Sequence, residues 1–301
     1  MVDPSRLPGA IRALFPFDSH FLDVDGGSMH YIDEGPRDGD VLLAVHGNPT
    51  WSFYWRRLIE TFRKTHRVVV LDHIGCGLSD KPQDWPYRLA GHRDNLLKLV
   101  EHLDLNDITL AVHDWGGAIG MAMAARAPER ISRLIITNTA AFRSKEIPFS
   151  IATCRWPVFG PLMVRGFNAF ARAATIRAAS SPLPRPVRDG LVLPYDSWAN
   201  RIATLRFVED IPLSEDHPSY ADLLEVEESL AQFTDRPMLI CWGDGDFCFT
   251  DSFRAEWQRR FPDAEVHAWP EVGHYVMEDA HSRVLPLIAS FFEQHPLGNA
   301  E

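Results

Sequence analysis

A carboxylate, Asp114, stands between an apolar run and a helical pattern in the segment Leu110–Ala118. The run Ile108–Val112 is typical of a buried strand, and Gly116 and Gly117 would let that strand and a helix approach closely at a tight turn. A helix N-terminus stabilises the ionised form of such a carboxylate. The pattern therefore predicts a nucleophile that can attack carbon, and the alternative is that Asp114 only caps the helix.

A general base for this nucleophile is best supplied by His274, one of 13 histidines in the chain. His274 follows the apolar run Ala264–Ala268 in a loop that contains glycine. A second carboxylate that orients the imidazole is expected after another strand, close to Gly243. We favour Asp246, three residues after that glycine, and Asp244 is the nearby rival.

The loop after the apolar run Val41–Val45 holds the polar sequence His46-Gly47-Asn48-Pro49-Thr50. Backbone N–H groups at this place can stabilise a negatively charged oxygen, and we expect the donors to be Asn48 and Trp115. The alternative is an ordinary turn. Three further histidines lie next to the expected site and are interpreted as structural: His46, His73 and His113.

The elements that must position these groups alternate along the chain. Continuous apolar runs are typical of parallel strands that are buried on both faces, and here they are Val41–Val45, Val68–Leu71, Ile108–Val112, Leu134–Thr137, Met238–Trp242 and Ala264–Ala268. Helical patterns lie between them, at Trp55–Phe62, Ala90–Leu103, Ala118–Arg126, Phe253–Arg260 and Arg283–Glu293. Strands alternating with helices predict an α/β fold with a mostly parallel central sheet. A hairpin of Phe21–Leu22 and Met29–Ile32, turning at Asp25-Gly26-Gly27, is expected to add antiparallel strands at one edge.

The alternation is interrupted between about residues 142 and 211. This stretch is rich in proline, shows no clear strand and has helical apolar segments at Val158–Phe170 and Trp198–Val208. We interpret residues 142–211 as a helical cap inserted into a main domain of residues 1–141 and 212–301.

Composition narrows the function classes. The chain has 30 Lys and Arg against 41 Asp and Glu, a net charge of −11, which argues against nucleic acid or an anionic membrane as a partner. The four cysteines are scattered and read as free thiols. No metal or dinucleotide motif is present, so no cofactor and no metal are expected. Residues 1–17 lack a signal-peptide run and no stretch is long enough to span a membrane, which predicts a cytoplasmic protein.

Taken together, these segments resemble the haloalkane dehalogenases of the α/β-hydrolase fold, and within them the branch that also holds the β-lactone decarboxylases of olefin biosynthesis. The resemblance runs from Phe15 to Pro296. The segments that carry it are His46-Gly47-Asn48-Pro49-Thr50-Trp51, residues 72–82, His113-Asp114-Trp115-Gly116-Gly117 and Gly273-His274-Tyr275, and residues 138–142 and 198–201 look typical of the decarboxylase branch. The strict G-x-S-x-G motif of the fold is not met, because Val112 and Asp114 replace its first glycine and its serine.

The resemblance adds expectations about side chains. It implies that the Asn48 amide and the Trp115 indole N–H hold a departing halide, which needs neutral donors in an apolar pocket. Some dehalogenases place a Glu after the sixth core strand, but this chain has Thr137-Asn138-Thr139, so Asp246 remains the expected acid. Several apolar cap residues suit a hydrophobic small-molecule substrate: Trp156, Phe159, Leu162, Met163, Phe167 and Phe170.

Two enzymatic functions follow from the resemblance. The first is a haloalkane dehalogenase. Asp114 displaces halide to form an alkyl-enzyme ester, and His274 then deprotonates the water that hydrolyses this ester to an alcohol. The alternative is a cis-3-alkyl-4-alkyloxetan-2-one decarboxylase, which gives a cis-alkene and CO₂. An epoxide hydrolase is a minor alternative, because it needs two cap tyrosines and only Tyr195, with Tyr220 just beyond the cap, could serve. The sequence leaves open whether the chain forms a homo-oligomer or joins a biosynthetic complex.

Overall fold

A computed structural model describes residues 7–297 and contains a central sheet of eight strands in the order β1-β2-β4-β3-β5-β6-β7-β8. Strands β3 to β8 are parallel to one another, whereas β2 runs antiparallel to both β1 and β4. The strand bounds are β1 His20–Val24, β2 Gly27–Glu34, β3 Val41–Val45, β4 Arg67–Leu71, β5 Ile108–Asp114, β6 Ile131–Thr139, β7 Met238–Gly243 and β8 Glu265–Trp269. The predicted strands and edge hairpin are thus all present. Residues 1–6 and 298–301, assigned above to the main domain, lie outside the described residues.

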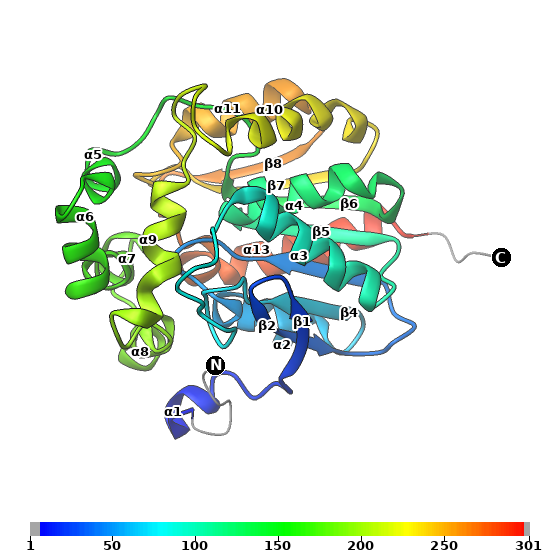
Figure 1. The fold of residues 1–301 in the computed structure, drawn as a ribbon. Coiled ribbons are helices and arrows are strands. Elements are labelled where there is room, and N and C mark those ends of the chain that lie inside the picture. Colours follow the sequence, from blue (N-terminus) through cyan, green and yellow to red (C-terminus); the bar gives the residue numbers. More distant parts are fainter. Residues whose placement is uncertain (1–6, 298–301) are drawn as a thin grey trace.

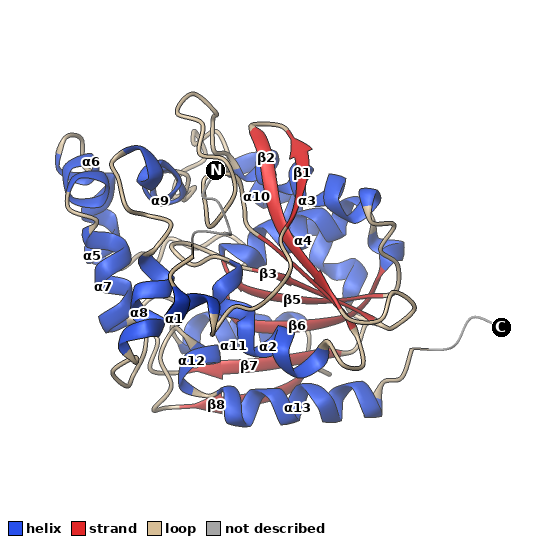
Figure 2. Ribbon diagram, turned by 90° about the horizontal axis from the view of Figure 1, so that it is seen from below, coloured by secondary structure: helices blue, strands red, loops and turns tan. Residues whose placement is uncertain are grey.

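Helices cover both faces of this sheet (Figures 1 and 2). One face carries α3 (Leu89–His102), α4 (Trp115–Arg126), α10 (Tyr220–Ser229) and α11 (Asp251–Arg260), and the other carries α2 (Arg56–Phe62), α12 (Val276–Asp279) and α13 (His281–Gln294). Alternate residues of one strand enter different cores, as Leu43 packs on the first face and Leu42 on the second. Burial on both faces is the physical reason for the continuous apolar runs. The remaining short elements outside residues 142–211 are α1 (Gly9–Arg12), η2 (Ser52–Trp55), η3 (Pro128–Arg130) and η7 (Leu230–Phe233).

Within residues 142–211 the chain leaves the sheet and forms a group of short helices beyond the carboxyl ends of the parallel strands (Figure 1). They are α5 (Phe149–Ala152), η4 (Thr153–Arg155), α6 (Phe159–Pro161), the π-helical η5 (Leu162–Gly166), α7 (Ala169–Arg177), α8 (Arg185–Val192), η6 (Ala199–Arg201) and α9 (Ile202–Glu209). No strand forms between residues 142 and 211. The division into a main domain and a cap at these residues remains a prediction.

The predicted helical segment Val158–Phe170 is confirmed for residues 159–166, which form α6 and η5, but it does not continue as one helix to Phe170. The helix is interrupted at Asn168, which takes a left-handed backbone with φ of 55° before α7 begins. The Asn168 side-chain Nδ2 donates to the Tyr195 carbonyl oxygen at 2.9 Å, and Arg201 donates to the carbonyl oxygen of Arg165 at 2.6 Å. These tertiary hydrogen bonds favour a turn that local helix propensity does not reveal.

Candidate active site

The turn between β5 and α4 presents Asp114 at the carboxyl edge of the sheet. Asp114 has a positive φ of 53°, a conformation that non-glycine residues adopt mainly where the surroundings enforce it. A side chain at Gly116 would collide with the carbonyl oxygen of Val45, and one at Gly117 would collide with the Thr139 hydroxyl. The two glycines therefore allow the close approach that the sequence predicted. The Asp114 side chain makes no capping hydrogen bond to α4, which argues against the capping interpretation.

Two other predicted residues lie beside Asp114. The Nδ1 atom of His274 is 2.8 Å from Oδ2 of Asp246, and its Nε2 atom is 3.7 Å from Oδ2 of Asp114. All three side chains are buried. The rival acid Asp244 instead forms an ion pair with Arg254, at 2.9 Å from the guanidinium Nε. The geometry therefore brings together Asp114, His274 and Asp246 and separates Asp244 from them.

Asn138, at the end of β6, is a residue of this site that the sequence analysis passed over. Its Nδ2 donates to Oδ2 of Asp246 and to the Gly243 carbonyl oxygen, both at 2.9 Å, and its Oδ1 accepts from the Gly243 N–H at 2.8 Å. The backbone N–H of Cys248 donates to the other Asp246 oxygen at 2.6 Å. The only signal in the sequence was positional, because Asn138 follows the strand after which some dehalogenases carry their acid.

The charges of the site are coupled. Burial raises the pKa of Asp114, and His274 together with the N–H groups of Trp115 and Asn48 only partly offsets this effect. Burial would lower the pKa of His274, but the carboxylates of Asp246 and Asp114 outweigh it and raise that pKa above the usual 6.5. The imidazole is therefore a stronger base than a free histidine, and its cation is stabilised beside Asp114.

The loop at residues 46–50 directs one peptide group at Asp114. The Asn48 N–H donates to Oδ1 of Asp114 at 2.6 Å. At the other end of the same trans peptide, the Gly47 carbonyl oxygen accepts from His46 Nδ1 at 2.7 Å and from the Thr50 hydroxyl at 3.1 Å. Because the C=O and N–H of a trans peptide point in opposite directions, these bonds fix the donor toward Asp114.

The three histidines interpreted as structural bond to the backbone around this site. His46 Nε2 accepts from the His73 N–H at 3.1 Å, and His73 Nε2 lies 3.0 Å from the His46 carbonyl oxygen. His113 Nε2 lies 2.9 Å from the carbonyl oxygen of His274. Burial, the largest cause in each case, lowers the pKa of all three, so they are neutral at physiological pH.

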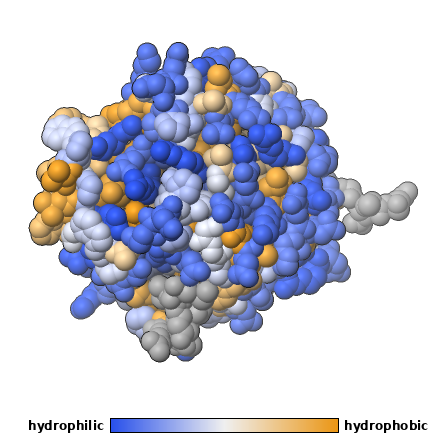
Figure 3. Space-filling model, in the orientation of Figure 1, coloured by the Kyte–Doolittle hydropathy of each residue, from blue (hydrophilic) through white to orange (hydrophobic). Residues whose placement is uncertain are grey.

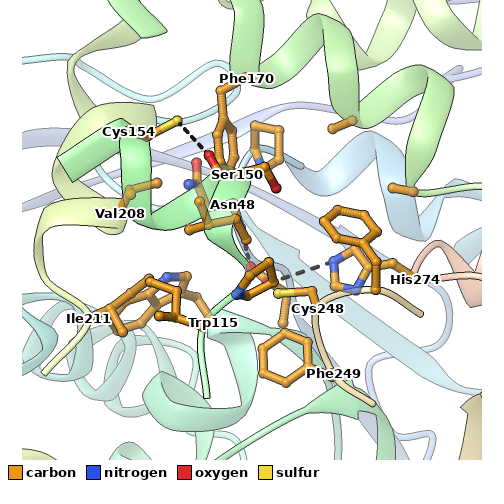
Figure 4. A pocket seen from close by; sticks show the side chains of 18 of the residues that line it. Asn48, Trp115, Ser150, Cys154, Phe170, Val208, Ile211, Cys248, Phe249 and His274 are labelled. Atoms are coloured by element: carbon orange, nitrogen blue, oxygen red, sulfur yellow. Dashed lines mark hydrogen bonds and ion pairs between the residues drawn. The ribbon is translucent and has the colours of Figure 1, made fainter. Parts of the chain in front are cut away.

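A cavity of about 350 Å³ opens above Asp114 and is lined mainly by apolar side chains. Figure 4 shows Trp115 and His274 on opposite sides of it, with Asn48 between them and Phe170 farther from the sheet. Of the six apolar cap residues expected to suit a hydrophobic substrate, Phe159, Met163 and Phe170 line the cavity. The other three are exposed to solvent: Trp156, Leu162 and Phe167.

The Asn48 amide differs from the arrangement that the resemblance implied. Its Nδ2 donates to the carbonyl oxygen of Thr204 on α9 at 3.2 Å, and its Oδ1 is buried without a hydrogen-bond partner. One amide donor that a halide would use is thus engaged with the protein. The Trp115 ring lines the cavity and packs against Phe207 with centroids 5.4 Å apart. A halide role for these two side chains stays a prediction.

The two candidate acids give a matched pair of variants. We expect Asp246→Asn to lower kcat/KM about 10³- to 10⁴-fold, because the imidazole loses the carboxylate that orients it and stabilises its cation. Asp244→Asn should stay within about threefold of wild type, since it removes only a partly exposed ion pair with Arg254. Initial rates of both variants test this prediction, and a larger loss in Asp244→Asn would contradict the assignment.

Comparison with known proteins gives consistent relatives. The model of the alpha/beta hydrolase fold family matches residues 40–280. The cis-3-alkyl-4-alkyloxetan-2-one decarboxylases of Shewanella oneidensis and Xanthomonas campestris pv. campestris are 46% and 44% identical, each over 94% of this chain and over 91% and 98% of their own lengths. A haloalkane dehalogenase of Mycolicibacterium paratuberculosis is 31% identical over 92% of this chain and 93% of its own.

Solved structures show the same fold. A haloalkane dehalogenase of Bradyrhizobium elkani matches with a TM-score of 0.82 and 25% identity, covering 92% of this chain and 99% of the other. A putative ancestral haloalkane dehalogenase matches with a TM-score of 0.83 and 24% identity, covering 91% of this chain and 98% of the other.

Proposed function

Because the chain belongs to the α/β-hydrolase fold family, in the branch that holds haloalkane dehalogenases and β-lactone decarboxylases, we propose that it converts a cis-3-alkyl-4-alkyloxetan-2-one into a cis-alkene and CO₂. The observation that carries this proposal is the identity of 44–46% with two such decarboxylases, against 31% with the dehalogenase. The sequence alone favoured the dehalogenase over the decarboxylase, whereas the identities of these relatives favour the decarboxylase.

The proposed reaction uses Asp114 as the nucleophile in two balanced steps. Oδ2 of Asp114 attacks ring carbon C4, the C4–O1 bond breaks, and its electrons remain on the substrate as a carboxylate. The C3–C2 bond then breaks, CO₂ leaves, the released electron pair forms the C=C bond, and the Asp114 carboxylate departs. Inversion at C4 followed by loss of the two groups from opposite sides gives a cis-alkene from a cis-lactone. Neither step consumes water or a proton.

The surrounding groups support these steps. The Asn48 N–H holds Oδ1 of Asp114, which leaves Oδ2, near His274, free to attack. A protonated His274 stabilises the carboxylate that Asp114 becomes when it leaves, and Asp246 stabilises that cation. We further propose that residues 142–211 act as a cap, whose helices supply the apolar cavity wall that holds alkyl chains.

Other activities fit the site less well. Dehalogenation remains the second candidate, supported by the Trp115 ring in the cavity, although one donor of the Asn48 amide is engaged by Thr204. An epoxide hydrolase would need two tyrosines that reach into the cavity from the cap. Tyr195 instead donates to the Thr50 carbonyl oxygen at 3.1 Å, and the Tyr220 hydroxyl accepts from Arg143 at 3.0 Å. Neither of these tyrosines lines the cavity.

The direct test supplies the purified protein with a cis-dialkyl β-lactone and, separately, with a bromoalkane of similar length. We expect alkene and CO₂ from the lactone at a kcat/KM within the common enzymatic range of about 10⁴ M⁻¹s⁻¹ or more, and bromide release at least about 100-fold slower. Gas chromatography measures the alkene, and an ion-selective electrode measures bromide. Rapid bromide release without alkene would replace the proposal with a dehalogenase.

A further inference from the structure

Exposed apolar side chains gather on one part of the protein. Among residues 7–297, large hydrophobic side chains that are exposed to solvent occur, apart from Leu14, only between residues 149 and 198. We call this set the apolar cap surface, and it consists of Phe149, Trp156, Val158, Phe159, Leu162, Phe167, Ile176 and Trp198. Figure 3 shows hydrophobic residues collected at the edge of the molecule where Figure 1 places α5 and α6.

Several members of this surface form continuous contacts. The ring centroids of Phe149 and Trp156 are 6.2 Å apart, and those of Trp156 and Phe159 are 6.0 Å apart. Phe149 and Val158 are 75% and 80% exposed, so these side chains contribute little to any internal core. Exposed patches of this kind mark sites of interaction with another molecule or with a membrane.

The charge of this region is opposite to that of the rest of the chain. Residues 142–211 contain ten Lys and Arg against five Asp and Glu, whereas the remaining residues contain 20 against 36. Arg165 stacks over the exposed Trp198 ring at 4.7 Å, and Arg201 donates to the carbonyl oxygen of Gly166 at 3.1 Å. Burial and the positive charge of Arg172 lower the pKa of Arg201, while Asp196 opposes that shift. The expectation against an anionic membrane rested on the charge of the whole chain, whereas residues 142–211 carry a net positive charge.

The cavity reaches solvent through the same region. Most residues that line it are buried or half-buried, and all of its exposed lining residues lie between residues 146 and 177: Glu146, Ser150, Phe159, Ala173 and Arg177. Phe159 belongs to both the cavity wall and the apolar cap surface. A molecule that leaves the cavity therefore meets exposed apolar and basic side chains first.

We propose that the apolar cap surface docks on the surface of an anionic lipid bilayer, with the cavity mouth facing the membrane. The inference rests on the proposed function, because a long-chain alkene has no polar atom and partitions into hydrocarbon rather than water. Aromatic and aliphatic side chains enter the headgroup boundary while arginines contact lipid phosphates. No helix within residues 7–297 is long and apolar enough to cross a membrane, so the attachment is interfacial. Because residues 142–211 carry a net positive charge, they attract an anionic bilayer and repel the same region of a second copy.

Sedimentation with lipid vesicles tests the docking. We expect the full chain to bind vesicles of phosphatidylcholine mixed equally with phosphatidylglycerol, and to bind pure phosphatidylcholine at least about tenfold more weakly. High salt should also weaken binding, because it screens the arginines. The combined variant Phe149→Ser, Trp156→Ser and Val158→Ser should lose at least about tenfold in affinity for the mixed vesicles. Leu14→Ser is the matched control and should bind as wild type does.

Two results would overturn the proposed docking on a membrane. Wild-type protein that stays in the supernatant with the mixed vesicles has no membrane surface. If light scattering instead finds a dimer that the triple variant dissociates, the apolar cap surface is an interface between copies. None of the three replaced side chains lines the cavity, so turnover of a short-chain, water-soluble lactone should be unchanged in the variant. Failure of wild type to turn over that lactone defeats the proposed function, while sedimentation still reports on docking.

Discussion

Asp114→Asn is expected to lower the rate of alkene formation at least about 10⁴-fold, because an amide cannot form the ester on which both proposed steps depend. Bromide release from a bromoalkane should fall to the same extent, since both reactions begin with attack by this carboxylate. The measurement is the initial rate for each substrate at saturating concentration. Loss of both activities together would place them on one nucleophile.

The substitution is a conservative test of Asp114. Asparagine adopts positive φ at least as readily as aspartate, so the backbone at φ of 53° remains accessible. Its side-chain oxygen can still accept the hydrogen bond from the Asn48 N–H. Thermal unfolding within a few degrees of wild type provides the control for folding. A residual rate within about tenfold of wild type would show that another group attacks the substrate.

The parts of the site that follow local patterns could be predicted from the sequence. Strands buried on both faces produce continuous apolar runs, and parallel strands place the loops that follow them at one edge of the sheet. That edge brings Asp114 at the end of β5, Asp246 after β7 and His274 after β8 to within hydrogen-bonding or ion-pair distance. Chain order and strand type were therefore sufficient to predict the fold and the proximity of these residues.

The parts that depend on tertiary contacts could not be predicted. Asn138 reads as an ordinary strand residue, and only folding brings its amide against Asp246, 108 residues later in the chain. The break at Asn168 depends on a hydrogen bond to Tyr195, which local apolar periodicity does not encode. Apolar periodicity also could not distinguish Phe170, in the cavity wall, from Phe167, which faces solvent.

His274→Gln should separate the two candidate reactions. With a bromoalkane, the variant should release about one bromide per protein and then stop, because hydrolysis of the Asp114 ester needs a base to activate water. With the β-lactone, turnover should continue, because the proposed steps consume neither water nor a proton. The rate should fall roughly 10- to 100-fold, which corresponds to about 1.4 to 2.7 kcal/mol for the lost cation beside the departing carboxylate. The measurements are the amounts of bromide and of alkene released per protein, and the mass of the intact protein, which reveals an ester on Asp114.

The pH profile of the wild-type protein gives the control for this variant. The pKa of His274 is raised above 6.5, so the imidazole is cationic at lower pH and loses its proton as the pH rises through that pKa. Decarboxylation that uses the cation should therefore decline as the pH rises through the pKa of His274, whereas at lower pH protonation of Asp114, whose pKa burial raises, should limit the rate. The rate of bromoalkane hydrolysis should instead rise with pH, since hydrolysis needs the neutral imidazole of His274 as a base. His274→Gln should lose the decline in decarboxylation, and a wild-type decarboxylation rate that does not vary through this pH range would exclude a cationic role for His274.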